Sequence, residues 1–339
     1  MALVYDATYV TGQELTGYVR EALADLPANQ FGLARFLPDT FVDDIDFRAD
    51  VGGGGLTQAA QFRSYDTESP IGKRAGISKI SGELPPISEK IRLGEYDRLK
   101  LRNASEAIKN KILDDGVAQA VKILARAEVA RGELLSAGKV TIQENGLSLE
   151  ADFGRKATHS PVASQLWNTA SSSPIDDLLA WVEVYKNTNG VRPERALVDQ
   201  RVVSVLMRNA QIRSLALPEN STAQIVTIDA IQALLRSFGL PFLETYEAQV
   251  EGADGTAQSI LDPTKVIFLP PSTAKIGETQ WGTTAESLSK DYKLEEEFQP
   301  GIVVGSYSDQ DPVAQWTKAS AIMLPIAPNI NLTLAAKVL

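Results

Sequence analysis

Residues 104–138 read ASEAIKNKILDDGVAQAVKILARAEVARGELLSAG, the longest stretch of the chain with a helical pattern. Asn103 stands before it and Glu106 follows three residues later, which is the arrangement of an N-cap with a capping-box glutamate. Apolar residues recur at steps of three to five, and Gly138 is placed to end a helix. The pattern predicts one helix over about 103–137, roughly 50 Å long. Its steps do not keep to heptads, which disfavours a coiled coil, and Gly116 is a point where it could bend.

After this helix the pattern changes twice. Residues 139–153 alternate apolar and polar side chains around Asn145-Gly146, the pair typical of a type I′ turn, and this predicts a β-hairpin. From Pro174 onward, helical and strand patterns alternate, which predicts an α/β domain with its own core. Its expected helices cover residues 175–188, 200–210 and 228–239, and its expected strands cover residues 194–199, 241–250 and 265–270. Residues 313–339 are typical of strands that return to a sheet.

The chain before the long helix offers much less material for a core. The first 50 residues predict one short helix over 13–26, followed by a loop with apolar side chains over 31–47. Residues 56–91 are rich in Ser, Gly, Pro and charge, with two weakly alternating stretches at 61–67 and 77–84. A hairpin with so few large apolar side chains is marginal by itself. This segment is therefore expected to need a partner surface.

The run VGGGGL at residues 51–56 does not fit a phosphate-binding loop. A dinucleotide loop needs glycines at steps of two and three, and Thr57 or Gln58 occupies the third position here. The Walker pattern fails as well, because Arg74 follows Gly72-Lys73 and Thr67 stands where a glycine is required. Gly52, Gly53, Gly54 and Gly55 are instead interpreted as a hinge between the N-terminal arm and the loop that follows. A merely tolerated surface loop is the alternative.

The composition excludes several kinds of chemistry. The chain has no cysteine and one histidine, His159, so disulfides, cysteine nucleophiles and Cys/His zinc sites are impossible. No Gly-x-Ser-x-Gly elbow occurs, and His159 is expected to be a surface or hydrogen-bonded loop residue. Paired carboxylates at 176–177 and 295–297 leave open a metal- or carboxylate-dependent hydrolase, although a helix first turn and a solvated face explain them better. We expect no catalytic residue, no cofactor and no metal.

The net charge of −10 is unevenly spread. Residues 1–50 hold three basic against nine acidic side chains, residues 98–139 hold nine against five, and residues 240–311 hold four against thirteen. A self-associating subunit can use such an uneven charge distribution to attract and orient further copies of itself. The alternative is that each charged cluster is an ordinary solvent-exposed face. The chain has no dense basic patch with interleaved aromatic residues, so the sequence does not predict a nucleic-acid-binding site. No apolar run long enough for a membrane span and no signal peptide occur, so a cytoplasmic protein without membrane contact is expected.

The order of these elements resembles the major capsid protein of tailed bacteriophages, which has the Hong Kong 97-type shell fold. Locally the chain is similar to the lambda-type branch, the major capsid protein E-like proteins. The stretches that carry this similarity are RFLPDTFVDDIDFR at 35–48, LPPISEKIRLGEYDRLKLRN at 84–103 and DPTKVIFLPPSTAKIGETQWGTTAES at 262–287. The resemblance implies an α+β fold and a structural, non-enzymatic subunit that assembles into the icosahedral head around double-stranded DNA. An encapsulin-like protein compartment shares the fold and is the alternative.

The resemblance also implies a division of the chain. Residues 1–50 would form the N-terminal arm, 51–95 the extended loop, 96–160 with 311–339 the peripheral domain and 161–310 the axial domain. The implied partners are further copies in pentamers and hexamers, a portal, possible decoration proteins and DNA enclosed without sequence-specific binding. A separate scaffold protein is expected, because no room precedes the arm for a scaffolding domain. Assembly is expected in the host cytoplasm, and the final location is the virion.

Contacts between subunits are expected in the arm and the loop. In the isolated subunit the apolar side chains should be half-exposed and available to neighbouring copies: Phe41, Phe47, Leu56, Phe62 and Ile77. Arg63, Lys73 and Arg74 should meet acidic residues of an adjacent subunit, which favours correct register more than strength. Lys73 and Lys79 lie in the loop, but no partner for a covalent crosslink is indicated, and none is expected.

Overall fold

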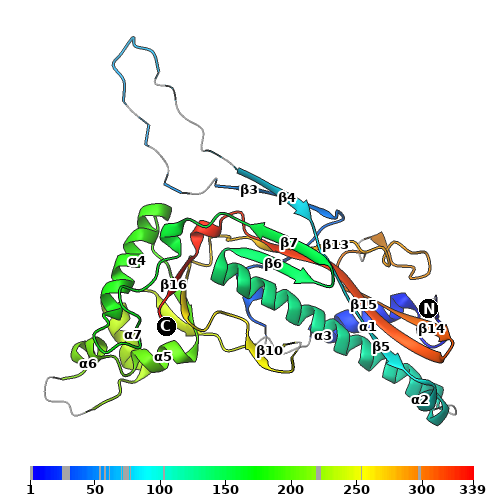
Figure 1. Cartoon of the computed structure of the whole chain (residues 1–339). Coiled ribbons are helices and arrows are strands. Elements are labelled where there is room, and N and C mark those ends of the chain that lie inside the picture. Colours follow the sequence, from blue (N-terminus) through cyan, green and yellow to red (C-terminus); the bar gives the residue numbers. More distant parts are fainter. Residues whose placement is uncertain are drawn as a thin grey trace. The chain divides into compact units, whose positions relative to one another are not determined.

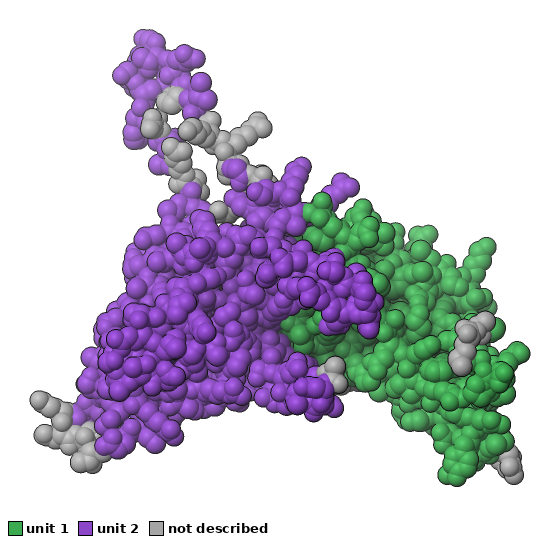
Figure 2. Space-filling model, viewed as in Figure 1, with its two compact units in different colours: residues 1–47, 81–131, 278–326 green, residues 48–80, 132–277, 327–339 purple. Residues whose placement is uncertain are grey.

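The computed structural model describes residues 3–24, 31–52, 55–56, 59–60, 62–69, 71, 76, 78–101, 104–218, 223–252, 254–296 and 299–339. The chain divides into two compact units, coloured in Figure 2. Unit 1 contains residues 1–47, 81–131 and 278–326, and unit 2 contains residues 48–80, 132–277 and 327–339. No helix in the described part of the chain has both the length and the apolar character needed to cross a membrane.

The predicted long helix is present as α3 (Ser105–Ala137), 33 residues long. Gly138 ends it with φ of +80°, and its N–H donates to the Leu134 carbonyl at 2.8 Å. The Arg155 guanidinium donates to the carbonyls of Leu134, Leu135 and Ser136, where it meets the negative end of the helix dipole. Burial lowers the pKa of Arg155 to about 10. Glu106 lies in the first turn as expected, whereas the predicted cap Asn103 lies outside the described residues.

Unit 1 is built on a six-stranded sheet whose centre is a strand of 14 residues, β15 (Val313–Ile326). The order is β1-β14-β15-β13-β2, and β5 pairs with the other edge of β15. The remaining strands are β1 (Val4–Tyr5), β2 (Asp39–Phe41), β5 (Pro86–Leu93), β13 (Glu278–Gly282) and β14 (Val303–Gln310). The expected return of the C-terminal segment to a sheet is confirmed by β15. The sequence did not predict β2, β5, β13 or β14, which are identified only by their pairing.

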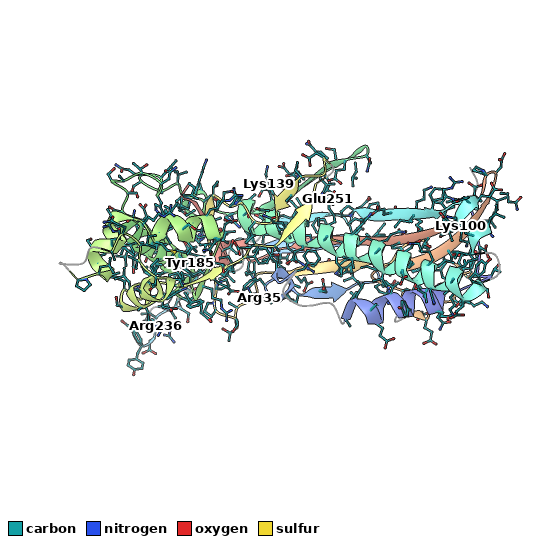
Figure 3. The ribbon with its side chains drawn as sticks, turned by 90° about the horizontal axis from the view of Figure 1, so that it is seen from below. Arg35, Lys100, Lys139, Tyr185, Arg236 and Glu251 are labelled. Carbon is teal, nitrogen blue, oxygen red and sulfur yellow. The ribbon has the colours of Figure 1, made fainter. Side chains whose placement is uncertain are left out.

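The helices of unit 1 pack against this sheet. The predicted N-terminal helix is α1 (Gly12–Ala24), and its Thr16 hydroxyl bonds both the N–H and the carbonyl of Val304 on β14 at 3.1 Å. The Gln119 side chain of α3 bonds the backbone of β15, so α3 lies along these strands in Figure 3. A Cβ at Gly116 would approach Leu15, Val19 and Val304 to 3.2–3.3 Å. Gly116 is thus a close-packing position between α1, α3 and β14.

Unit 2 holds the predicted α/β domain. Its four-stranded sheet has the order β16-β12-β8-β9 and contains β8 (Arg195–Val198), β9 (Phe242–Thr245), β12 (Lys265–Leu269) and β16 (Leu334–Lys337). The helices are α4 (Pro174–Asn189), α5 (Gln200–Leu206), α6 (Ala210–Ala216) and α7 (Ile228–Ser237). The core includes Trp167 stacked on Trp181 at 5.9 Å between ring centroids. These elements confirm the predicted alternation of helices and strands.

Two elements of unit 2 are shorter than predicted. The helix expected over 200–210 ends at Leu206, because Asn209 begins a new helix and its side chain accepts hydrogen bonds from the N–H groups of Gln211 and Ile212. The strand expected over 241–250 is interrupted after Thr245, and β10 (Gln249–Glu251) pairs instead with β11 (Ala257–Ser259). The predicted hairpin is present as β6 (Lys139–Glu144) and β7 (Leu147–Asp152). Asn145 and Gly146 have φ of 49° and 85°, which confirms the I′ turn.

The region before α3 contains more strand than expected. Residues 31–47, predicted as a loop, contain the short helix η1 (Leu33–Arg35), β2 and the start of β3 (Asp46–Val51). β3 pairs with β4 (Ser78–Glu83), and β5 and the short helix α2 (Glu95–Lys100) then lead to α3. Two further short helices are η2 (Ala157–His159) and η4 (Ile330–Leu332). The predicted strand over 61–67 is wrong for the residues described there, which form turns and extended chain.

Candidate assembly surfaces

The segment between β3 and β4 is exposed throughout its described residues. Every residue that the structure describes between Gly52 and Gly76 is exposed, and in Figures 1 and 2 this segment projects from the rest of unit 2. Its apolar side chains include Leu56 at 67% exposure and Phe62, Tyr65 and Ile71, each close to fully exposed. Exposed apolar groups at this density mark an interaction surface. Leu56 and Phe62 are therefore as available as predicted.

A local turn shapes the tip of this exposed segment. The Arg63 guanidinium donates to the Thr67 carbonyl at 2.7 Å, and the Thr67 hydroxyl donates to the Ser64 carbonyl at 2.8 Å. Asp66, between them, has φ of 62°, in the left-handed region. The described tip residues therefore have a defined backbone path even though their side chains lie in solvent. The predicted contact residues Lys73, Arg74 and Ile77 lie outside the described residues.

The base of the segment corrects one expectation. Phe47 was expected to be half-exposed, but its ring is only 3% exposed. A Cβ placed on Gly82 of β4 would lie 2.9 Å from Phe47 Cε1, so the glycine makes the space that the ring fills. The pairing of β3 with β4 brings these two residues together, and the sequence alone does not show this contact. Phe47 belongs to the core of unit 1, not to its free surface.

The glycine run lies where the chain leaves β3. Gly52 and Gly55 have φ of +101° and +137°, which only glycine adopts readily, while Gly53 and Gly54 lie outside the described residues. Val51, the last residue of β3, is buried. Leu56 then rests on the end of α4, because a Cβ at Gly190 would lie 3.1 Å from Leu56 Cδ2. Gly52 and Gly55 thus turn the chain with positive φ between β3, whose residues alternate between exposed and buried, and the exposed segment.

Phe41 marks a second candidate surface, at the edge of the unit 1 sheet. Its side chain is 62% exposed, as expected for an assembly contact, and it lies on β2, the last strand of the sheet order. A mainly apolar groove of about 450 Å³ adjoins it, lined by Arg20, Leu23, Ala24, Asp39, Phe41, Leu124, Trp281 and Ile302. An apolar groove at a sheet edge can bind a side chain or segment of another protein.

Buried charges hold the residues next to this groove against α3. Glu128 and Arg131 of α3 are almost fully buried, and Glu128 accepts a hydrogen bond from the Leu33 N–H at 2.6 Å. Arg131 pairs with Glu128 at 3.1 Å and with Asp39, and it donates to the Thr279 hydroxyl at 2.8 Å. Removing one partner from a buried ion pair is strongly destabilising. This network therefore ties residues 33–39 to the long helix.

The basic character of residues 98–139 is partly neutralised within the folded chain. Lys109 pairs with Glu14 at 2.7 Å, and Lys122 pairs with Glu89 at 2.5 Å. Lys139 pairs with Glu150 at 3.0 Å. These pairs lie at the surface, where water and salt screen them and they contribute little to stability. Their effect here is to reduce the positive field along α3 that the sequence alone suggested.

Structural roles explain three further residues that were candidates for catalysis or metal binding. His159 is fully buried, and its Nδ1 lies 2.9 Å from the Thr333 carbonyl oxygen, so it is hydrogen-bonded as one alternative predicted. Asp176 and Asp177 lie in the first turn of α4 as expected. Asp177 accepts from Trp167 Nε1 at 2.9 Å, which explains its burial. Among the described residues, no group of three or more His, Cys, Asp or Glu side chains could hold a metal ion.

Comparison of the whole fold with solved structures finds the same architecture in phage proteins. The putative capsid protein of a prophage of Escherichia coli CFT073 superposes with a TM-score of 0.65 at 14% identity, covering 98% of this chain and 100% of that one. A phage-related protein from Bordetella bronchiseptica RB50 superposes with a TM-score of 0.57 at 14% identity, covering 99% and 98%. At these identities the similarity shows the shared α+β fold.

Comparison of the sequence with known proteins gives the family. No curated protein sequence matches the chain. The family model of phage major capsid protein E matches residues 51–338. The match includes the exposed segment, α3 and the four-stranded sheet of unit 2, and it supports the resemblance drawn from residues 84–103 and 262–287, whereas the stretch at 35–48 lies outside the matched residues. The chain therefore belongs to the phage major capsid protein E family and is a subunit of a phage capsid shell.

Proposed function

We propose that this subunit forms the icosahedral head of a tailed phage by laying its exposed segment over a neighbouring copy. The observation that carries the proposal is that every described residue between Gly52 and Gly76 is exposed, although the segment contains Leu56, Phe62, Tyr65 and Ile71. Burying one such side chain contributes about 1.5–3 kcal/mol. Several buried per copy and repeated around a shell give strong association from individually weak contacts.

In this proposal the parts of the chain have separate tasks. Residues 1–50 act as the arm and 51–95 as the extended loop, with Gly52 to Gly55 as the hinge between them. Residues 96–160 with 311–339 form the peripheral domain around α3, and 161–310 form the axial domain. The buried network of Glu128 and Arg131 supports an arm that is fixed at residues 33–39. Phe41, beside the apolar groove, supports a further contact from the arm.

The proposed partners follow from the same surfaces. Copies of the chain form pentamers and hexamers, with a separate scaffold protein, a portal and possible decoration proteins completing assembly in the host cytoplasm. Arg63, Lys73, Arg74 and Ile77 are proposed to contact the neighbouring copy together with the apolar loop residues. Double-stranded DNA is enclosed without sequence-specific contact, which the pairing of Lys109 and Lys122 with glutamates supports. The role is structural and non-enzymatic, and the family match favours a phage head over an encapsulin-like compartment or a hydrolase.

The test is a triple substitution in the loop, Phe62→Ser, Tyr65→Ser and Ile71→Ser. Each of these side chains is close to fully exposed, so the subunit should keep its circular dichroism spectrum and unfolding midpoint. We expect at least a tenfold loss of shells counted by electron microscopy and an accumulation of free subunits in gel filtration.

A matched control changes two polar residues of the same segment, Ser64→Ala and Glu68→Ala. Both side chains are exposed, and neither would bury a large apolar surface against a neighbour. The control should assemble like the unmodified protein. Normal shells from the triple variant, or failure of the unmodified protein to assemble with or without the phage's other head proteins, would show that the proposal is wrong.

A further inference from the structure

The unit 2 sheet has an edge strand with which another chain can pair, and capsid subunits accumulate in many copies. β9 is the last strand in the order β16-β12-β8-β9, and no strand of the described chain pairs with its outer side. Exposed edge strands offer N–H and carbonyl groups with which another chain can pair. Two exposed aromatic side chains lie in or next to this strand, Phe242 at 52% and Phe238 at 39% exposure.

The backbone pairing shows which groups face outward. The N–H of Phe242 donates to the Glu194 carbonyl, and the N–H of Tyr246 donates to the Val198 carbonyl, both at 3.0 Å. Because backbone groups alternate in direction along a strand, positions 241, 243 and 245 face away from β8. Position 241 is a proline and has no N–H to offer. Leu243 therefore holds the central donor and acceptor of this edge.

Gln232 of α7 takes up both of these groups. Its Nε2 donates to the Leu243 carbonyl at 2.6 Å, and its Oε1 accepts from the Leu243 N–H at 3.2 Å. A neighbouring strand would make the same pair of hydrogen bonds with this residue. The side-chain amide therefore occupies the place of a strand partner, and the Leu243 residue is itself buried.

We propose that Gln232 blocks the β9 edge and so prevents it from pairing with an extended segment of a second copy. The second copy is the relevant partner because capsid subunits accumulate together and each carries exposed extended chain between Gly52 and Gly76. Pro241 and Gln232 act at adjacent outward positions, which leaves only Thr245 with an outward N–H in β9. The proposal depends on membership of the capsid family and not on how the exposed loop contacts its neighbour.

The experiment compares free subunits carrying Gln232→Leu or Gln232→Ala with the unmodified protein. Hydrogen exchange at the Leu243 amide should become about fivefold faster, because one hydrogen bond contributes about 1 kcal/mol and local opening controls exchange. Light scattering should show concentration-dependent association with increased thioflavin binding. The control is Arg236→Ala, an exposed residue on the same helix labelled in Figure 3, which should change neither measurement.

A second substitution separates edge blocking from loss of the fold. Phe242→Lys places a charge beside the same edge, at an exposed side chain, without restoring the hydrogen bonds of Gln232. The pair Gln232→Leu with Phe242→Lys should remain dispersed while Leu243 still exchanges rapidly. If Gln232→Leu alone stays dispersed at every concentration, or if Phe242→Lys does not suppress its association, the proposal is overturned.

Discussion

Replacing Gly132 with alanine tests how closely α3 is packed in unit 2. A Cβ at this position would lie 2.3 Å from the carbonyl oxygen of Ile260, 2.6 Å from its Cγ2 and 2.9 Å from its carbonyl carbon. Ordinary carbon–oxygen contacts lie at about 3.3 Å or more, so the backbone at 260 must retreat by roughly 1 Å. The side chain cannot relieve this clash by rotating, because the obstructing atoms include main chain. We expect Gly132→Ala to destabilise the subunit.

The expected change in the free energy of unfolding follows from two destabilising contributions and one stabilising contribution. Overpacking in a filled site costs about 1–3 kcal/mol, and an unyielding backbone oxygen favours the upper end. Retreat of the segment also stretches the 3.3 Å hydrogen bond from the Asp262 N–H to the Ser136 hydroxyl, a loss of up to about 1 kcal/mol. Alanine recovers about 1 kcal/mol through its higher helix propensity. The net expectation is a loss of roughly 2–3 kcal/mol in the free energy of unfolding.

Gly17→Ala is the matched control, because Gly17 lies within α1 and a Cβ there would meet nothing within 4 Å. Only the helix propensity changes, so this variant should gain about 0.5–1 kcal/mol. Both variants are compared with the unmodified subunit, in the disassembled state, by urea unfolding followed by circular dichroism and tryptophan fluorescence. If Gly132→Ala is as stable as Gly17→Ala, the close approach of Ile260 to α3 does not exist and the reasoning is wrong.

Two further predictions concern buried charge. Arg131→Met removes the cation that pairs with Glu128 and Asp39, so we expect a loss of about 3–5 kcal/mol in the free energy of unfolding and faster tryptic cleavage after Arg35. Lys122→Met, which removes a solvent-exposed ion pair on the same helix, should change cleavage little, and equal cleavage of both variants would contradict the role given to the network. Burial lowers the pKa of His159, so the unfolded chain binds more protons than the folded one between the lowered pKa and about 6.5. Stability should therefore be complete above about pH 6.5 and fall as the pH drops through that window, while His159→Gln should lose this pH dependence; parallel pH profiles of unfolding midpoint would refute it.

Elements with strong local signals were predicted well. The helix at 105–137 has sustained apolar periodicity and a glycine at its end, and the hairpin at 139–152 contains Asn-Gly between alternating residues. These signals depend on neighbours in sequence, which is why they could be read without a structure. The strands β2, β5 and β13 were missed because their partners lie far away in sequence, whereas β14 was missed although its partner β15 begins only three residues later. β2 pairs with β13, for example, although residues 39–41 and 279–281 lie in distant parts of the chain.

The assembly surfaces likewise contain some residues whose exposure the sequence predicted and others that only the structure revealed. Phe41, Leu56 and Phe62 are exposed as expected, because each lies in a segment whose own sequence offers little to bury it. Phe47 is buried, because Gly82 on the paired strand leaves room for its ring. The network of Glu128, Arg131 and Asp39 was not foreseen either. A charged residue in a sequence is expected to be exposed to solvent. Only the folded structure shows that these charged side chains contact one another.

The sequence alone determined the long helix, the hairpin, the α/β alternation and the absence of thiol chemistry, because each depends on residue type and local spacing. The tertiary structure decided the meaning of the glycines: Gly52 and Gly55 turn the chain with positive φ, whereas Gly116 and Gly132 admit close neighbours. From the sequence alone, a glycine is equally suited to a turn with positive φ and to a close packing contact, because it lacks a Cβ. Only the backbone angle and the atoms that approach it distinguish a turn from a packing contact.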